Sequence, residues 1–418
     1  MKKSLLAVAA IGAFASAAQA QSSVTVYGIL DVGFQGVTTR GNAASSTSTA
    51  VQNPVAGGKS NQTRFTGEGS ESTSRLGFKG TEDLGGGTSA FFTAEFALAP
   101  TDATLSGQYG NGLFNRQTFV GLKKNGIGQA AIGTQYTIIH EAVGATDPGQ
   151  QNNIAGNVIY ATSSNLTAAS NANSGHTDAY TVRTSNMLKL VSDQFYGFKV
   201  TGTVTANNQN NNQTTVTSGQ TTTVTGGVNN QNGWGLGVDY TWQKLLVTAN
   251  YQAFTSKNPY VVNNTTGVAT PFATWSTATG GSNVQDNQAY IAATYDFGIL
   301  KAYAQYVSNK VQAQATPAQL ERTAQQIGVR SFVTPTIEAW ASAGTGRFEG
   351  QNLAQSAAAL TVKSSASQNF TGYQLGSNYW LSKRTNMYAI FGSTQVSGSS
   401  VAVSEGGSSY GVGVRHTF

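Results

Sequence analysis

Basic side chains recur at alternate positions of segments that otherwise alternate between apolar and small or polar residues. Arg75 and Lys79 share a parity with Gly77 and oppose Leu76 and Phe78. Successive side chains of a strand point to opposite faces, so both cations are predicted to leave the sheet on its polar side. Cations in a row beside water attract anions, so the chemistry expected of them is electrostatic rather than catalytic.

Three further cations extend this basic set. Arg116 shares its parity with Thr118 and Val120, whereas Arg183 and Lys189 alternate with two leucines further along the chain. Parity therefore predicts that all three point to the same polar side as the first two.

Two carboxylates offer these cations a simpler role. Tyr27, Asp31 and Glu95 are predicted to lie on the polar faces of their own strands. The arginines could then be ordinary partners of Glu95 or Asp31, without any action on a passing solute.

The sequence predicts no enzyme, cofactor or metal site. There is no cysteine, and the three histidines are scattered at positions 140, 176 and 416, so no nucleophile, base and orienting group come within reach of one another. The formal charge of +6 would fall to +4 once Lys2 and Lys3 were removed with a leader. No dense basic run exists, so a nucleic-acid partner is not expected.

Strand signals run from one end of the chain to the other. They predict strands at 24–34, 73–81, 88–98, 113–123, 127–136, 183–191, 195–205, 234–240, 245–254, 288–295, 299–307, 323–332, 337–343, 370–380, 385–394 and 410–418. Short turns alternate with long polar connections at 37–72, 99–111, 137–182, 206–233, 255–287, 308–322, 344–369 and 395–408. The asparagine-rich stretch 207–231 is expected to be an irregular external loop.

These sixteen strands predict an all-β fold, a 16-stranded antiparallel transmembrane β-barrel. Lipid offers no hydrogen bonds, so a sheet that crosses a membrane must close on itself. Short turns at one end and long loops at the other are typical of bacterial outer-membrane barrels. A barrel of this size has room for an aqueous channel.

The two ends of the chain agree with export to a membrane. Residues 1–20 have the basic start, apolar stretch and Ala18-Gln19-Ala20 site of a signal peptide, so the barrel domain is expected to span residues 21–418. The last strand alternates from Tyr410 and stops on Phe418, with aromatic residues at both ends of its apolar face. Aromatic edges of this kind are usual at the two membrane interfaces of a barrel.

Several segments together resemble the general porins of Gram-negative bacteria, of the trimeric betaproteobacterial and neisserial type. The resemblance rests on residues 22–31, on the segment 74–87 that reads SRLGFKGTEDLGGG, on 116–122, on 381–385 and on 412–418. These motifs lie in the first third and at the C-terminal end of the chain. The middle of the chain resembles the family only in the spacing of its strands and loops. One position departs from the family: Thr134 stands where porins commonly have an arginine in Gly-Arg-Gln-Tyr.

The resemblance implies a homotrimer, one pore per barrel, and a third external loop, here 137–182, that folds inward. Arg75, Arg116 and Arg183 then occupy the positions of wall arginines at the constriction of anion-preferring members. The loop carries Glu141, Asp147 and Asp178 with no lysine or arginine between 137 and 181. Acid on the loop facing base on the wall would set a field across the pore. Insertion into outer-membrane lipid by the barrel-assembly machinery, which reads the last strand and Phe418, is also implied.

The expected function is passive diffusion of small hydrophilic solutes and inorganic ions, with weak anion preference. One alternative is a substrate-selective channel on the same scaffold, which would need a dedicated binding site or a track of aromatic rings for sugars. Another is a surface barrel that acts as an adhesin or receptor through its long loops.

Overall fold

The computed structural model describes residues 23–41, 58–106, 112–160, 179–218, 221–257, 284–314, 319–353, 364–398 and 405–418. The described elements are β1 (Ser23–Gly41), β2 (Gly58–Thr66), β3 (Arg75–Gly85), β4 (Thr88–Ala97), β5 (Asn115–Lys124), β6 (Gly128–Tyr136), α2 (Ile138–Thr146), β7 (Arg183–Ser192), β8 (Phe198–Ser218), β9 (Thr221–Trp242), β10 (Leu245–Lys257), β11 (Val284–Asp296), β12 (Lys301–Ala313), β13 (Gln319–Phe332), β14 (Ile337–Leu353), β15 (Ser364–Trp380), β16 (Thr385–Gly398) and β17 (Glu405–Thr417). The expected signal peptide, residues 1–20, lies outside the described residues.

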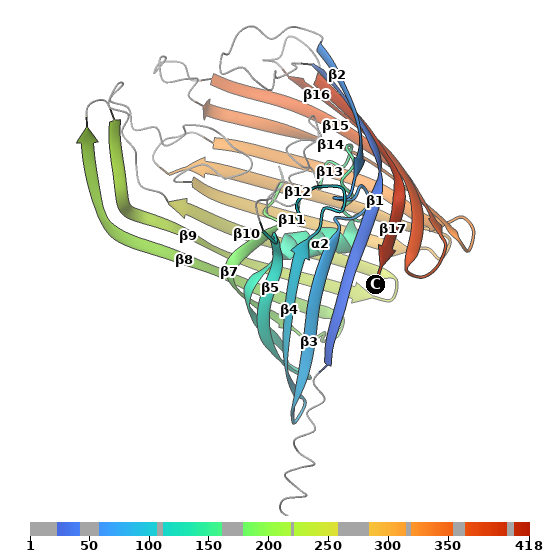
Figure 1. The fold of residues 1–418 in the computed structure, drawn as a ribbon, viewed down its shortest axis with the longest axis horizontal. Helices are drawn as coiled ribbons and strands as arrows, with labels where there is room; N and C mark the ends of the chain where they lie inside the picture. The colour runs from blue at the N-terminus through green and yellow to red at the C-terminus, as the bar shows by residue number, and fades with distance from the viewer. Residues whose placement is uncertain are drawn as a thin grey trace, which may run out of the picture.

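Hydrogen bonds close the sheet into a ring. β1 pairs with β17 along one edge and with both β2 and β3 along the other (Figure 1). β2 and β3 pair with successive parts of β1 and together make one wall strand, so the seventeen segments form sixteen wall strands. The predicted 16-stranded antiparallel barrel is confirmed, and its closure leaves no open backbone edge toward lipid.

The short turns follow the prediction, but strands extend into most of the predicted long connections, and two of these connections differ most. β2 lies within the expected loop 37–72, and the β8–β9 hairpin continues to Ser218 and Thr221 through the stretch expected to be irregular. Antiparallel pairing continues there because the stretch is rich in threonine, a β-branched residue that suits extended backbone. Low charge and high polarity were therefore a poor guide to strand ends.

The two faces of the wall differ in chemistry. On β7, Leu188 and Leu190 are exposed on the outer face, whereas Met187 and Lys189 are buried on the inner one. Outward apolar and inward polar side chains are the pattern of a barrel surrounded by lipid. Within the described residues, no helix is long and apolar enough to cross a bilayer.

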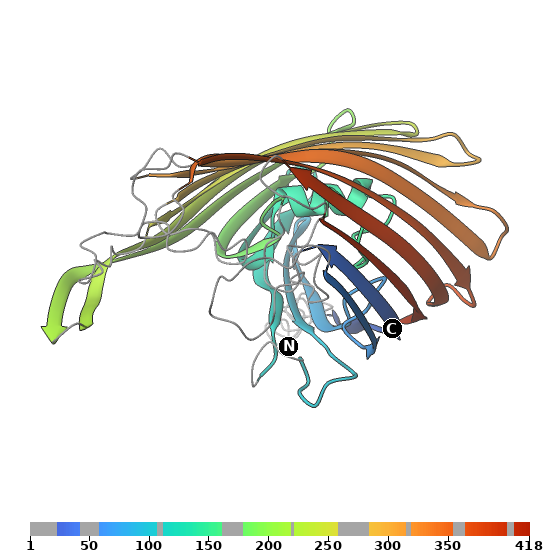
Figure 2. The same ribbon diagram turned by 90° about the horizontal axis from the view of Figure 1, so that it is seen from above.

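Chain from outside the wall occupies the barrel interior. The segment after β6, residues 137–160 and 179–182, is called the inner loop below; it includes α2, which Figure 2 shows enclosed by the strands. The helix begins at Thr137, whose hydroxyl accepts a hydrogen bond from the His140 amide at 3.3 Å. Residues 67–74, between β2 and β3, also turn inward, and the amides of Glu71 and Ser72 donate to the Asp31 carboxylate.

Candidate functional site: the interior of the barrel

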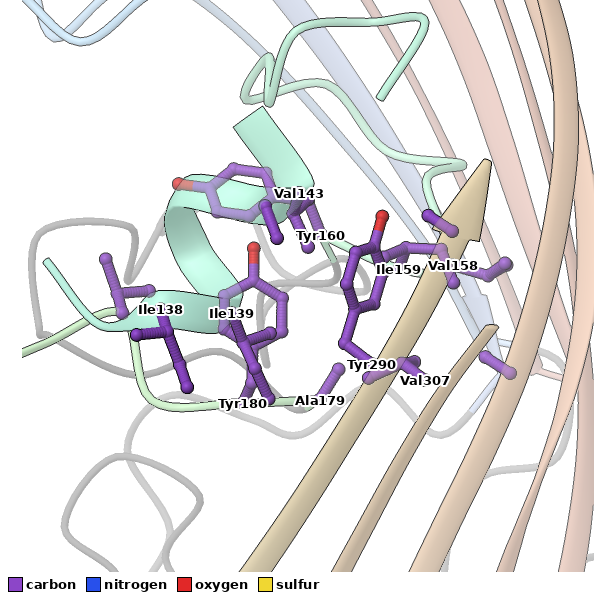
Figure 3. Packing of buried hydrophobic residues seen from close by; sticks show 14 of the residues in the cluster. Ile138, Ile139, Val143, Val158, Ile159, Tyr160, Ala179, Tyr180, Tyr290 and Val307 are labelled. Atoms are coloured by element: carbon purple, nitrogen blue, oxygen red, sulfur yellow. The ribbon is translucent and has the colours of Figure 1, made fainter. Parts of the chain in front are cut away.

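The inner loop is held to the wall by an apolar cluster. Ile139 and Val143 of α2 are fully buried and pack with Tyr180 and with Tyr290 and Val307 of the wall (Figure 3). At the end of the helix, the Thr146 hydroxyl lies 2.6 Å from the Tyr290 hydroxyl. One side of α2 is therefore fixed against β11 and β12 by burial of apolar surface.

A belt of wall glutamines holds the rest of the inner loop. Five buried glutamines on five strands form this glutamine belt: Gln252, Gln288, Gln305, Gln326 and Gln374. Each points inward, because its neighbours along the strand are on the outer face.

The glutamine belt bonds to loop backbone that would otherwise lack partners. Gln288 accepts from the Thr181 amide at 2.8 Å, and Gln326 accepts from the Val158 amide at 3.1 Å. Gln374 donates to the carbonyl oxygens of the two residues before Gly156, at 2.6 and 3.0 Å. Buried backbone groups need hydrogen-bond partners. The glutamine belt therefore supplies to the inner loop the partners that a neighbouring strand would supply in a sheet.

Two wall glycines allow the loop backbone to touch the wall. A Cβ at Gly372 would collide with the carbonyl oxygen of Gly156, and a Cβ at Gly392 would collide with that of Ala155. No other residue type leaves room for this approach, so the loop is seated at backbone distance from β15 and β16.

Opposite the belt, two arginines converge on one carboxylate. The guanidinium of Arg116 donates from Nε to Glu95 at 2.9 Å, and Arg75 Nη1 lies 3.8 Å from the same oxygen. The Tyr27 hydroxyl donates to Glu95 at 3.1 Å, while Arg116 Nη2 donates to the Tyr136 hydroxyl at 2.6 Å. The ion-pairing alternative therefore holds for Glu95, though not for Asp31.

Two more cations join this group. Arg183 lies with its Cζ 5.6 Å from the Tyr136 ring centroid, in cation–π geometry. Lys189 forms an ion pair with Glu141 of α2 at 2.5 Å. Arg75, Arg116, Arg183 and Lys189 are called the basic cluster; with Glu95 and Glu141 its formal charge is +2.

The inward aim of Arg116 has a different cause from the one expected. Glu95 pairs with Gln117 and the next residue of β4 pairs with Asn115, so Arg116 is the extra residue of a β-bulge. Beyond the bulge, Val120 is 62% exposed on the outer face. The expectation that Arg116, Thr118 and Val120 share one face is wrong, because the bulge reverses the parity of the strand.

The acidic loop residues are not arranged as expected. Glu141 faces the basic cluster and is 49% exposed, but Asp147 is buried within the loop itself. Its carboxylate accepts from the Asn157 amide at 3.0 and 3.1 Å and from the Gln326 amide at 3.2 Å, and burial raises its pKa above the usual value. Asp178 lies outside the described residues. Among the described acidic residues of the loop, Glu141 is therefore the one placed to face the wall cations.

His140 lies among aromatic rings beside the basic cluster. Its ring centroid is 4.5 Å from that of Tyr136, and Tyr160 and Tyr180 stand at 6.0 and 6.1 Å. Burial, with the nearby positive charge of Arg183 and the other cations, holds its pKa well below the usual value. No group of three or more histidine, cysteine, aspartate or glutamate side chains with metal-binding geometry occurs in the described part of the chain.

The remaining predicted residues lie along the wall. Lys79 is exposed, with its Nζ 5.3 Å from the centroid of the Tyr27 ring. Asp31 is buried beneath residues 67–74, and its carboxylate accepts a hydrogen bond from the Tyr388 hydroxyl at 2.6 Å. The backbone of Phe418 exchanges two 3.1 Å hydrogen bonds with Gly28, so the C-terminal residue helps to close the ring.

Two inward arginines on β13 were not among the predicted site residues. Arg330 makes a two-bond ion pair with Glu338 and donates to the Pro148 carbonyl at 2.8 Å. Arg322 donates to the Val158 carbonyl at 2.7 Å and stacks over Phe370. Parity against the outward Ile327 and Val329 could have found both, since the pairing of this strand with β14 runs without a shift of register.

Comparison with known proteins agrees with this architecture. The model of the Gram-negative porin family matches residues 7–399. The chain belongs to the Gram-negative porin family. An outer membrane porin protein of Bordetella pertussis is 38% identical over 151 residues, which cover 35% of this chain and 37% of that protein. The match thus spans little more than a third of that relative.

Solved structures support the fold across nearly the whole chain. An anion-selective porin from Comamonas acidovorans superposes with a TM-score of 0.59 at 19% identity, covering 95% of this chain and all of that one. The trimer form of OmpT from Vibrio cholerae gives a TM-score of 0.56 at 14% identity, covering 95% and 99%. At these identities the likeness concerns the fold alone.

Proposed function

We propose that this porin is a general diffusion channel of the outer membrane, through which small hydrophilic solutes and inorganic ions pass passively. The observation that carries the proposal is a polar interior lined on one side by the basic cluster, with a formal charge of +2. Low-dielectric walls focus the field of such a group, and inward cations favour anions. A weak anion preference follows.

The constriction lies between the basic cluster and α2 in this proposal. Arg75 and Lys79 stand on one strand, four residues apart. Glu141 meets the basic cluster from the loop side through its ion pair with Lys189, with half of its side-chain surface exposed. Two opposed signs of charge across a narrow passage orient polar solutes. They disfavour apolar solutes, which must displace ordered water.

We also infer a homotrimer in outer-membrane lipid, reached by an exported precursor whose residues 1–20 are removed. Support comes from family membership and from the apolar outer face. Phe418, paired with Gly28 at the seam, is proposed as the signal read by the barrel-assembly machinery. No catalytic step is needed for passive diffusion, and we assign none.

Joint substitution of Arg75, Arg116 and Arg183 by glutamine tests the proposal. The variant keeps the side-chain lengths roughly but removes three positive charges, so the reversal potential in a salt gradient should move toward cations. An unchanged reversal potential with normal conductance would refute the role of the basic cluster. The exposed cation Lys123, replaced by glutamine at the short-turn end of β5, serves as the control.

A further inference from the structure

A cavity of about 190 Å³ lies between α2 and the inner faces of β8, β9 and β10. Ile138, Glu141 and Ala145 line it from the helix, and Lys199 and Asp239 line it from the wall, close to the short-turn end of the barrel. Glu141, Lys199 and Asp239 keep 49%, 46% and 25% of their side-chain surface exposed. The cavity therefore opens to water in the interior.

The carboxylate of Asp239 is held in position from two sides. Lys199 Nζ lies 2.8 Å from Asp239 Oδ2, and the Thr248 hydroxyl donates to the other oxygen at 2.6 Å. Asn250, 8% exposed, donates to that hydroxyl at 2.7 Å. An arrangement held from two sides is preorganised for a ligand, because little side-chain entropy remains to be lost on binding.

The volume limits the size of the ligand. A cavity of roughly 150 Å³ accommodates benzene, so this slightly larger one suits a solute of about six to ten non-hydrogen atoms. That range covers small amino acids and excludes peptides and nucleotides.

The lining favours an aliphatic amino acid within that range. Both signs of charge are present in balance: Asp239 pairs with Lys199, and Glu141 pairs with Lys189, which lies outside the lining. A zwitterion, which carries one charge of each sign, matches this lining better than a simple ion. Ile138, Ala145 and Leu246 add an apolar patch for an aliphatic side chain. No aromatic ring lines the cavity among the described residues, so the stacking surface usual for sugars is missing.

We propose that this cavity is a binding site for small aliphatic amino acids, bound as zwitterions. The α-ammonium group lies between the carboxylates of Glu141 and Asp239, the α-carboxylate faces Lys199, and the side chain packs on Leu246. The proposal rests on the channel function above, because the solute reaches the cavity through the interior. It gives the channel a saturable site for one class of nutrient.

Calorimetric titration of the purified protein in detergent tests the site with L-valine as the probe. Isovalerate lacks the ammonium group and isobutylamine lacks the carboxylate, so each should bind about tenfold more weakly or not at all. Asp239→Asn should weaken L-valine binding by about tenfold, since it removes one charged hydrogen-bond partner. Ala145→Phe, at an exposed position of α2, should abolish binding by filling the cavity.

The matched control is Glu349→Gln, which breaks the comparable half-exposed pair with Arg347 outside the cavity and should leave binding unchanged. Absence of L-valine binding to protein that conducts in a bilayer would overturn the site and leave the channel function intact. Equal affinity for L-valine and glucose would overturn the assigned ligand class. Binding without conductance would instead contradict the proposed function.

Discussion

At the scale of a single residue, the carboxylate of Glu95 holds several cations in position. It receives two arginines and two tyrosine hydroxyls within 3.8 Å, and its side chain is 4% exposed. It both neutralises part of the positive charge inside the barrel and holds Arg75 and Arg116 in fixed positions.

Glu95→Gln should therefore change both selectivity and stability. Removal of one negative charge leaves two cations less compensated, so the reversal potential should move toward anions. Breaking a buried pair should lower the free energy of unfolding by about 3 kcal/mol. Bilayer recording and denaturant unfolding in detergent measure the two effects. Glu82→Gln, at an exposed position of β3, should show neither; a cation-ward shift in Glu95→Gln would contradict the assignment.

His140 provides a second test, through pH. Its pKa in the folded protein is well below the usual value, whereas the unfolded chain binds a proton near pH 6.5. The unfolded state thus takes up a proton that the folded state does not, so this group lowers stability as pH falls below about 6.5. His140→Gln should flatten the dependence of the unfolding midpoint on pH between about pH 7 and about pH 5.

The control for this prediction is His416→Gln. His416 lies on the outer face, with its Nδ1 2.8 Å from the Thr385 hydroxyl, so this variant removes a histidine that is outside the basic cluster. Equal slopes for wild type and His140→Gln would contradict this account, because they would show that the folded and unfolded chains bind the His140 proton equally.

At the scale of the structural elements, polar side chains that point inward from the wall stabilise the inner loop. Strands β10 to β15 would form the barrel without their inward glutamines, since the ladder hydrogen bonds come from the backbone. Five buried glutamines therefore point to a task other than wall formation, and their loop partners identify that task.

Gln326→Leu combined with Gln374→Leu should loosen the inner loop and leave the wall intact. Each change leaves buried backbone groups of the inner loop without a hydrogen-bond partner, which should lower the stability of the seated loop by about 1–3 kcal/mol. Residues 147–160 should then fluctuate. Open-channel current noise should rise, and protease should cut the loop sooner. Gln325→Leu, one residue away on the outer face of the same strand, is the matched control. Open-channel current noise at the wild-type level in the double variant would contradict the proposal that the glutamine belt holds the inner loop in place.

The number of strands, the closure of the barrel and the face on which most of the predicted charged side chains lie could be predicted from the sequence. Apolar and polar residues alternate along almost every wall strand, and this pattern is visible in the sequence. Two local features could not be predicted. The bulge at Arg116 depends on pairing with β4 and has no signature in β5 alone. Asp147 is turned into the loop because Asn157 and Gln326 donate to it, and those contacts depend on the tertiary fold.

At the scale of the whole molecule, a closed wall separates lipid from a polar interior, and the inner loop divides that interior. The loop is fixed to β10–β16 and leaves the basic cluster on β3, β5 and β7 opposite. In the proposed channel, solutes therefore pass through the space beside the basic cluster.

The central claim is that water and ions cross this interior under the field of the basic cluster. Planar-bilayer recording of the purified protein in a salt gradient tests it most directly. We expect stepwise conductance that is linear in voltage and a reversal potential of the sign that denotes faster anions. The proposed homotrimer predicts closure in three equal steps. Folded protein that inserts without conducting, or a reversal potential that denotes faster cations, would contradict the account.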